Sequence, residues 1–161
     1  MEKKELHISY LVCAETELPE ADRTLLEAAR RATQTSYAPY SHFCVGAALR
    51  LASGEMVCGS NQENAAFPSG TCAERCTVFY AQAQYPTEKF DTLAIAARNS
   101  RGGFTPSPIT PCGACRQVLA EVEKRQGSPL RLLLYGERCV YIVPDVASLL
   151  PFSFDDGSMT E

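Results

Sequence analysis

Three cysteines and one glutamate, in two short segments, have the residue types and spacing of a catalytic metal site. The first segment reads Thr-Cys-Ala-Glu-Arg and contains Cys72 and Glu74. The second reads Pro-Cys-Gly-Ala-Cys-Arg-Gln and contains Cys112 and Cys115. Three thiolates leave the fourth position of a tetrahedral zinc ion open for water, as a catalytic zinc site requires. A glutamate beside that water would carry its protons.

Both segments are expected to open helices, because apolar residues recur at helical spacing over residues 72–84 and 113–124. A helix N-terminus carries partial positive charge, which stabilises a thiolate and lowers the pKa of its thiol. Two helix starts that face one point would therefore form a rigid cradle for a metal ion.

The composition limits the class of protein and its partners. A chain of 161 residues that is 45% apolar predicts one domain, residues 1–161, in which 1–18 form an N-terminal extension of unclear role. The net charge of −4 argues against a nucleic acid partner, since phosphate binding requires a basic face. No apolar run approaches the ~20 residues that span a bilayer, and no signal-peptide pattern follows the charged N-terminus. These features predict a cytoplasmic protein that does not bind membranes.

The chain contains eight cysteines, but it is too long and too rich in apolar residues for a disulfide scaffold. A Cys-x-x-Cys in such a chain indicates metal binding or redox chemistry. The five cysteines outside the two motifs are expected to be small core residues: Cys13, Cys44, Cys58, Cys76 and Cys139.

The order of the predicted elements indicates one mixed sheet with helices on its faces. Only four residues, 136–139, connect the last two strands, so that pair should be antiparallel, because a parallel crossover needs a dozen or more residues. A loop rich in Gly, Ser and Pro is expected over 99–110. The predicted helices are 19–35, 72–84 and 113–124, and the predicted strands are 44–51, 56–60, 92–97, 130–135 and 140–143.

The chain resembles the cytidine deaminase family, small zinc enzymes that act on free nucleosides. The resemblance runs from about residue 20 onward and rests on the stretches 40–48, 61–67, 71–75, 111–119 and 149–154. It implies a three-layer α/β/α fold with a mixed five-stranded sheet and one Zn²⁺ per chain. It also implies deamination of cytidine and 2′-deoxycytidine to uridine and 2′-deoxyuridine in pyrimidine salvage, by a homotetramer with shared active sites.

The same resemblance assigns roles around the metal. Glu74 would take the proton of the attacking water, protonate N3 of the ring and later protonate the leaving ammonia. Cys72, Cys112 and Cys115 would be the zinc ligands. Arg75 would pair with a thiolate, and Gln117 would contribute a hydrogen bond next to the metal.

Substrate contacts are also implied by the resemblance. Asn61 and Glu63 match the pair that binds the ribose, with Glu63 accepting from the 3′-hydroxyl. Phe43 matches an aromatic position that lines the nucleoside pocket. The backbone N–H of Ala73 would bind the pyrimidine O2. Phe154 matches a C-terminal aromatic that packs over the base from a neighbouring subunit.

Other interpretations remain open at the level of sequence. Cys76 lies one helical turn after Cys72 and would complete a structural zinc site with four thiolates, as in a zinc-stabilised binding module. Cys112 and Cys115 alone would make a redox pair. Within deaminase chemistry, the substrate would instead be a cytosine-containing antibiotic, a modified nucleoside or a nucleic acid. The acidic pI of about 5.3 opposes the last of these.

Overall fold

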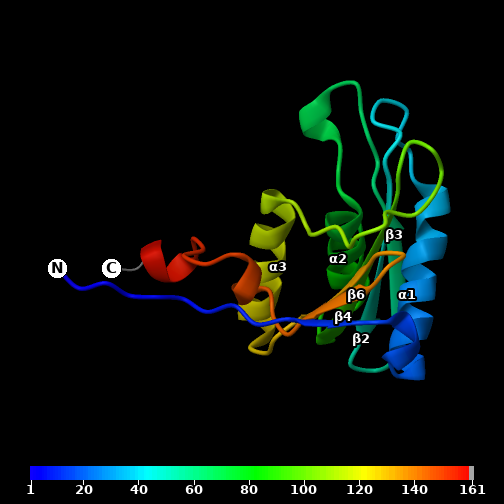
Figure 1. The fold of residues 1–161 in the computed structure, drawn as a ribbon. Helices are drawn as coiled ribbons and strands as arrows, with labels where there is room; N and C mark the ends of the chain where they lie inside the picture. The colour runs from blue at the N-terminus through cyan, green and yellow to red at the C-terminus, as the bar shows by residue number, and fades with distance from the viewer. Residues whose placement is uncertain (160–161) are drawn as a thin grey trace.

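The computed structural model describes residues 1–159 and places a six-stranded mixed sheet between helical layers (Figure 1). The strands lie in the order β1-β6-β5-β4-β2-β3. Strands β4 and β5 run parallel, and the other neighbouring pairs in this part of the chain are antiparallel. The strands are β1 Leu11–Cys13, β2 Cys44–Leu51, β3 Met56–Ser60, β4 Phe90–Arg98, β5 Arg131–Tyr135 and β6 Val140–Val143.

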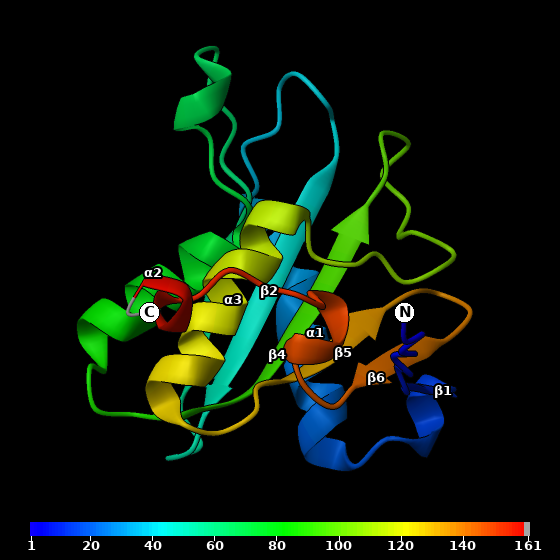
Figure 2. The same ribbon diagram turned by 90° about the vertical axis from the view of Figure 1, so that its left-hand side faces the viewer.

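Three helices cover the two faces of this sheet. The helix α1, Glu20–Ala32, lies on one face, and α2, Ala73–Gln84, and α3, Gly113–Gln126, lie side by side on the other (Figure 2). Each face has its own apolar core: one packs α1 against the sheet, and the other packs α2 and α3 against it. The expected three-layer α/β/α arrangement is confirmed. Among residues 1–159, no helix has the length and apolar character needed to cross a membrane.

The expected number of strands was wrong, because the sheet has six strands rather than five. The additional strand, β1, pairs antiparallel with β6 and extends the sheet at that edge. Its three residues are too few to give an alternating pattern, so tertiary pairing alone defines it. The antiparallel pairing of β5 with β6 is confirmed.

Most predicted boundaries agree with the structure to within two residues. Strand β4 begins two residues before the predicted range and ends one after it, and α3 continues to Gln126. Gly127 then ends α3 in the left-handed region, at φ 64°, where glycine is favoured. The expectation that the remaining cysteines are core residues was wrong, because Cys58 is exposed on the edge strand β3 and the other four are only partly buried.

Close packing fixes α1 on the sheet. Gly46 in β2 lies directly beneath this helix, and a Cβ atom there would be 2.2 Å from the carbonyl oxygen of Ala29. Any side chain at this position would push α1 away from β2, so the absence of one permits the helix to approach the strand.

A buried ion-pair network also ties α1 to two strands. Asp22 is buried, and its Oδ1 accepts from Arg50 Nη1 at 3.1 Å and from Arg131 Nη1 at 3.2 Å. Burial acts to raise the pKa of Asp22, but the hydrogen bonds and positive charge of the two arginines outweigh it and hold the pKa below its usual value. The ionised carboxylate is therefore the form that stabilises the fold.

We expect Asp22→Asn to lower the free energy of unfolding by about 2 kcal/mol at pH 7, because Arg131 loses the charge of Asp22 and Arg50 keeps only its ion pair with Asp91. A group whose pKa is depressed by folding contributes stability above its unfolded pKa of about 3.9 and loses it as the pH falls through the folded value. The difference between variant and parent should therefore shrink in acid. Urea denaturation at several pH values measures both effects. Glu20→Gln, an exposed change on the same helix, is the control, and equal losses in the two variants would contradict this account.

Candidate metal centre and active site

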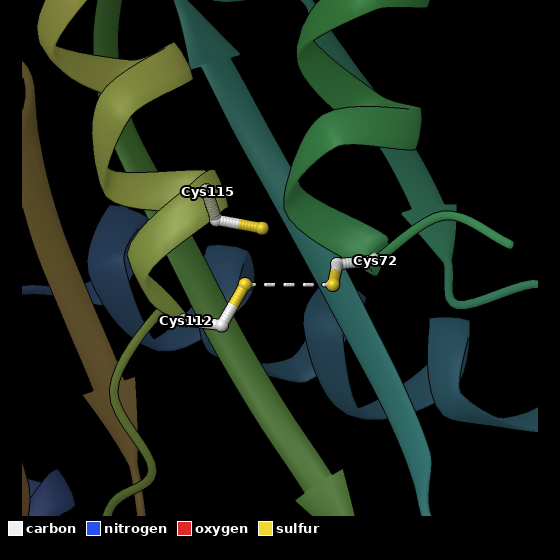
Figure 3. A group of neighbouring side chains, drawn as sticks. All are labelled: Cys72, Cys112 and Cys115. Atoms are coloured by element: carbon white, nitrogen blue, oxygen red, sulfur yellow. Dashed lines mark hydrogen bonds between the residues drawn. The ribbon is translucent and has the colours of Figure 1, made fainter. Parts of the chain in front are cut away.

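The structure brings the three motif cysteines together. Cys72 is the N-cap of α2, Cys112 is the N-cap of α3, and Cys115 lies in the first turn of α3. Their side chains point toward one another (Figure 3), and their sulfur atoms all lie within 4.8 Å of one another. The expectation that both motifs open helices and face one point is confirmed.

The spacing of these thiols fits a tetrahedral zinc ion. Zn–S bonds of about 2.3 Å at tetrahedral angles separate neighbouring sulfur atoms by roughly 3.8 Å. The Sγ atoms of Cys72 and Cys112 are 3.7 Å apart. Nη2 of Arg75 lies 3.7 Å from Cys72 Sγ, and the buried Nε of Arg75 has no hydrogen-bond partner. If the neighbouring cysteines were thiolates bound to a metal ion, their sulfur atoms would supply the hydrogen-bond acceptor that the buried Nε–H of Arg75 requires.

The electrostatics of the cluster favour a thiolate at Cys72. Hydrogen bonds from the Cys115 thiol, Arg75 and Cys112 lower the pKa of Cys72 to about 5, against the opposing effect of burial. The same interaction with Cys72, together with burial and the charge of Glu74, raises the pKa of Cys115. The cluster therefore retains a thiol proton that a metal ion must displace, which makes metal binding dependent on pH.

The fourth cysteine of the structural-zinc alternative lies outside this group. In the described part of the chain, the metal-ligating cluster contains Cys72, Cys112 and Cys115 and does not include Cys76. A set of three thiolates leaves a coordination position for water, so this arrangement favours a catalytic site over a closed structural one.

Glu74 lies between the metal motif and the core. Its side chain is buried, at 4% exposure, in the first turn of α2. Burial raises the pKa of Glu74, and the negative charge of Cys72 adds to this effect. A carboxyl group with a raised pKa, next to a metal site, has the properties of a general acid and base.

A cavity of about 520 Å³ opens beside the cluster and joins it to the predicted sugar-binding pair. Cys72 and Arg75 form part of its wall, and Asn61 and Glu63 form another part. The remaining wall residues are polar, aromatic or small: Tyr40, Ser41, Gln62, Asn64, Phe67, Gly70 and Thr71.

Glu63 is held in place by the segment that precedes β2. Its Oε2 accepts from the backbone N–H groups of Tyr40 at 2.9 Å and Ser41 at 3.3 Å, and its Oε1 accepts from the Ser41 hydroxyl. These bonds, led by that of the Ser41 side chain, lower the pKa of Glu63, so the group is a carboxylate at neutral pH. A carboxylate offers about four acceptor positions, so one remains for a ligand hydroxyl.

Asn61 holds together three segments near the cavity. Its Oδ1 accepts from the backbone N–H of Val45 at 2.8 Å and from the Ser36 hydroxyl, and its Nδ2 donates to the Phe43 carbonyl at 2.9 Å. One N–H of the amide is left for a ligand. Asn61 therefore shapes the cavity as well as lining it.

Other residues expected at the site lie in different surroundings. Phe43 packs against the core between the sheet and α2 and α3 and is not part of the cavity wall. Ala73 is fully buried, and as the first residue of α2 its N–H has no acceptor within the helix. Phe154 is exposed and lies outside the cavity of its own chain.

Gln117 differs from its expected placement. Its Nε2 donates to the carbonyl of Phe154 at 2.9 Å, so this side chain contacts the C-terminal tail. Residues two apart on a helix face different directions, so Gln117 does not share the side of α3 that carries Cys115. Arg116 donates hydrogen bonds to the carbonyls of Pro111 and Leu149. The guanidinium group that contacts a thiol of the cluster is therefore that of Arg75.

Sequence reasoning missed the residues that position Glu63. Tyr40 and Ser41 belong to a stretch that carried the resemblance, but they received no role. Their backbone and hydroxyl donors bind a carboxylate more than twenty residues later in the chain. The spacing of residue types gives no signal of such a contact, which depends on how two loops meet.

Three helix-borne thiols, a buried carboxyl group and an adjoining polar cavity define a class of metal-dependent hydrolytic site. The family model described as "cytidine and deoxycytidylate deaminase zinc-binding region" matches residues 19–126, which include all of these groups. The chain belongs to this family.

Individual relatives agree with the family match. A cytidine deaminase of Halalkalibacterium halodurans is 43% identical over 98 residues, which are 61% of this chain and 69% of the relative. A cytidine deaminase of Mycobacterium tuberculosis is 39% identical over 105 residues, 65% of this chain and 74% of the relative. The crystal structure of cytidine deaminase from Burkholderia pseudomallei superposes with a TM-score of 0.71 at 36% identity, covering 85% of this chain and all of that one.

We expect Cys72→Ser, Cys112→Ser and Cys115→Ser each to reduce bound zinc from about one ion per chain to roughly a tenth of that or less, because each removes one of three ligands. Elemental analysis of dialysed protein measures the change. Cys76→Ser is the matched control on α2 and should retain its zinc. Loss of zinc from the Cys76 variant would instead support a site with four thiolates.

Proposed function

We propose that this protein is a zinc-dependent deaminase that converts cytidine and 2′-deoxycytidine to uridine and 2′-deoxyuridine with release of ammonia, as in pyrimidine salvage. One observation carries the proposal: Glu74 is buried next to three clustered thiols, and one of these, Cys72, lines a cavity that Asn61 and Glu63 also line. A structural zinc module would need neither the buried acid nor the cavity.

The reaction consumes water and releases ammonia, so protons must move between the attacking and leaving groups. Zinc held by Cys72, Cys112 and Cys115 supplies the Lewis acidity that makes water nucleophilic near neutral pH. Glu74 accepts the proton of the attacking water and delivers it to N3 of the ring. It then accepts the proton of the hydroxyl formed at C4 and delivers it to the amino group, which leaves as ammonia. The raised pKa of Glu74 favours this exchange, because burial makes its carboxylate a stronger proton acceptor than that of an exposed glutamate.

The remaining groups orient the nucleoside. The N–H of Ala73, at the start of α2, is a donor for the pyrimidine O2, and Glu63 accepts a hydrogen bond from the 3′-hydroxyl that both sugars possess. The charged cavity residues also favour a nucleoside over a nucleotide. Glu63 is anionic, and Arg75, the cation among them, already lies against Cys72. A phosphate group would find repulsion there instead of a free counter-charge.

The proposed enzyme is a homotetramer with shared active sites. Phe154 does not reach the cavity of its own chain, so it is available to cover the base in a neighbouring site. Phe79 and Tyr80 on α2 are also exposed, which places aromatic surface on the layer formed by α2 and α3. The proposal includes a cytoplasmic location, where zinc-binding thiols remain reduced.

The loss of absorbance as cytidine is converted to uridine, with zinc measured in the same sample, tests the proposed function. Glu74→Gln should keep the fold and the zinc and lower kcat by roughly 10²–10⁴-fold or more, because glutamine has nearly the same shape and cannot transfer protons. Circular dichroism and elemental analysis provide the controls. A turnover close to that of the parent would reject the role of Glu74.

Removing the sugar contact should affect nucleoside use and spare the metal. We expect Glu63→Gln to lower kcat/KM for cytidine by about 10–100-fold, as for the loss of a hydrogen bond to a charged group, with zinc unchanged. Ser41→Ala should give a smaller loss, since it removes one of the donors that fix Glu63. Glu55→Gln, in the turn between β2 and β3, is the control. If free cytosine reacted as fast as cytidine, the enzyme would not recognise the sugar. If deoxycytidylate reacted as fast as cytidine, the cavity would not exclude a phosphate group.

A further inference from the structure

The N-terminal arm, residues 1–13, has no counterpart in the matched family region, which begins at residue 19. Alternate residues of this arm are apolar and exposed: Leu6 at 63%, Ile8 at 48%, Tyr10 at 51% and Val12 at 57%. In an extended segment, residues two apart lie on the same side. The arm therefore presents a continuous apolar side, which a monomer would leave in water.

The base of the arm is fixed, so its direction is set by the fold. Strand β1 pairs with β6, and the ring of Tyr10 lies 5.1 Å from the ring of Tyr141. Beneath this part of the arm is a largely apolar groove of about 370 Å³. The groove is lined by Ile8, Tyr10, Tyr141, Val143, Leu149 and Pro151, among others.

The arm projects from one particular side of the molecule. In Figure 1 it leaves the sheet and continues past α3, and the C-terminal tail projects in the same direction. In Figure 2, seen from that side, the arm and the short helix Asp156–Met159 lie on opposite sides of the molecule. The exposed aromatic residues Phe79 and Tyr80 belong to α2, which lies on the side of the sheet toward which the arm and the C-terminal tail project.

We propose that the N-terminal arm is an assembly element, whose apolar side packs against a second copy of this chain. A copy seated on the layer of α2 and α3 would lie between the arm and the C-terminal tail and would cover the Leu6, Ile8 and Tyr10 side. At about 3.3 Å per residue, the nine residues before Tyr10 reach roughly 30 Å, enough to cross a neighbouring helix layer. The inference rests on the proposed homo-oligomer and names the segment that stabilises it.

The charges of the arm favour a protein partner over a lipid surface or a nucleic acid. The tip contains Glu2, Lys3, Lys4 and Glu5, with Lys3 and Glu5 forming an ion pair at 2.6 Å. The charged side chains of these four residues balance, so the tip lacks the cluster of basic residues that recognition of anionic lipids or phosphates requires. The apolar side is thus the part of the arm that can provide binding energy.

Dissociation on dilution tests the proposal. Sedimentation velocity of the zinc-loaded full chain should show an oligomer whose dissociation midpoint rises at least tenfold in Leu6→Asp/Ile8→Asp, because two side chains would lose their apolar environment. A variant that lacks residues 2–9 keeps β1, and its dissociation midpoint should rise by a similar factor. The matched control, His7→Asp/Ser9→Asp, adds the same charge on the other side of the arm and should dissociate within about threefold of the parent.

Hydrogen exchange gives a second measurement that does not depend on a variant. The amides of residues 3–10 should exchange more slowly above the dissociation midpoint than below it. A monomeric parent, an oligomer indifferent to loss of residues 2–9, equal effects of the two double variants, or concentration-independent exchange would each overturn the proposal. Cytidine deamination and zinc content, measured in the same samples, report on the proposed function separately.

Discussion

The convergence of two helix N-termini on one point is the constraint on which the rest of this structure depends. Helices α2 and α3 pack on the same face of the sheet through Val78 and Leu119, and this packing sets where their first residues lie. Cys72 and Cys112 occupy the two N-cap positions, so both thiols lie where the partial charges of both helices are positive. A shift of either helix by one residue would rotate its thiol by about 100° away from the others.

Rigidity on the opposite face of the sheet supports this convergence. Gly46 lets α1 contact β2 directly, and Asp22 ties the same helix to Arg50 and Arg131. These contacts hold strand β2 at Gly46 and Arg50, and near the start of the strand the N–H of Val45 donates to Asn61 Oδ1. The cavity is consequently built on loops whose ends are held by buried strands, which is the usual means of keeping a binding site accurate.

The sequence was sufficient for the parts of the structure that depend on local pattern. Apolar periodicity predicts the two helices that start at the thiol motifs. The short connection of four residues predicts the antiparallel hairpin, and the resemblance implies the three-layer arrangement. Strand β1 was missed because three residues are too few to give a periodic signal. The contact of Gln117 with the C-terminal tail was missed because a motif does not show which way a helix residue points. The donors that hold Glu63 depend on the meeting of two loops, which only tertiary structure reveals.

Helix α3 links the metal site to the periphery of the molecule. Its first turn supplies two of the three thiols, and the turns that follow bind the C-terminal segment: Arg116 donates to the Leu149 carbonyl, Gln117 to the Phe154 carbonyl, and Glu123 accepts from the N–H of Val146. One helix therefore carries both two of the clustered thiols and the contacts that hold the C-terminal segment. In the proposed oligomer, a neighbouring copy that binds the tail would act on the same helix that carries Cys112 and Cys115.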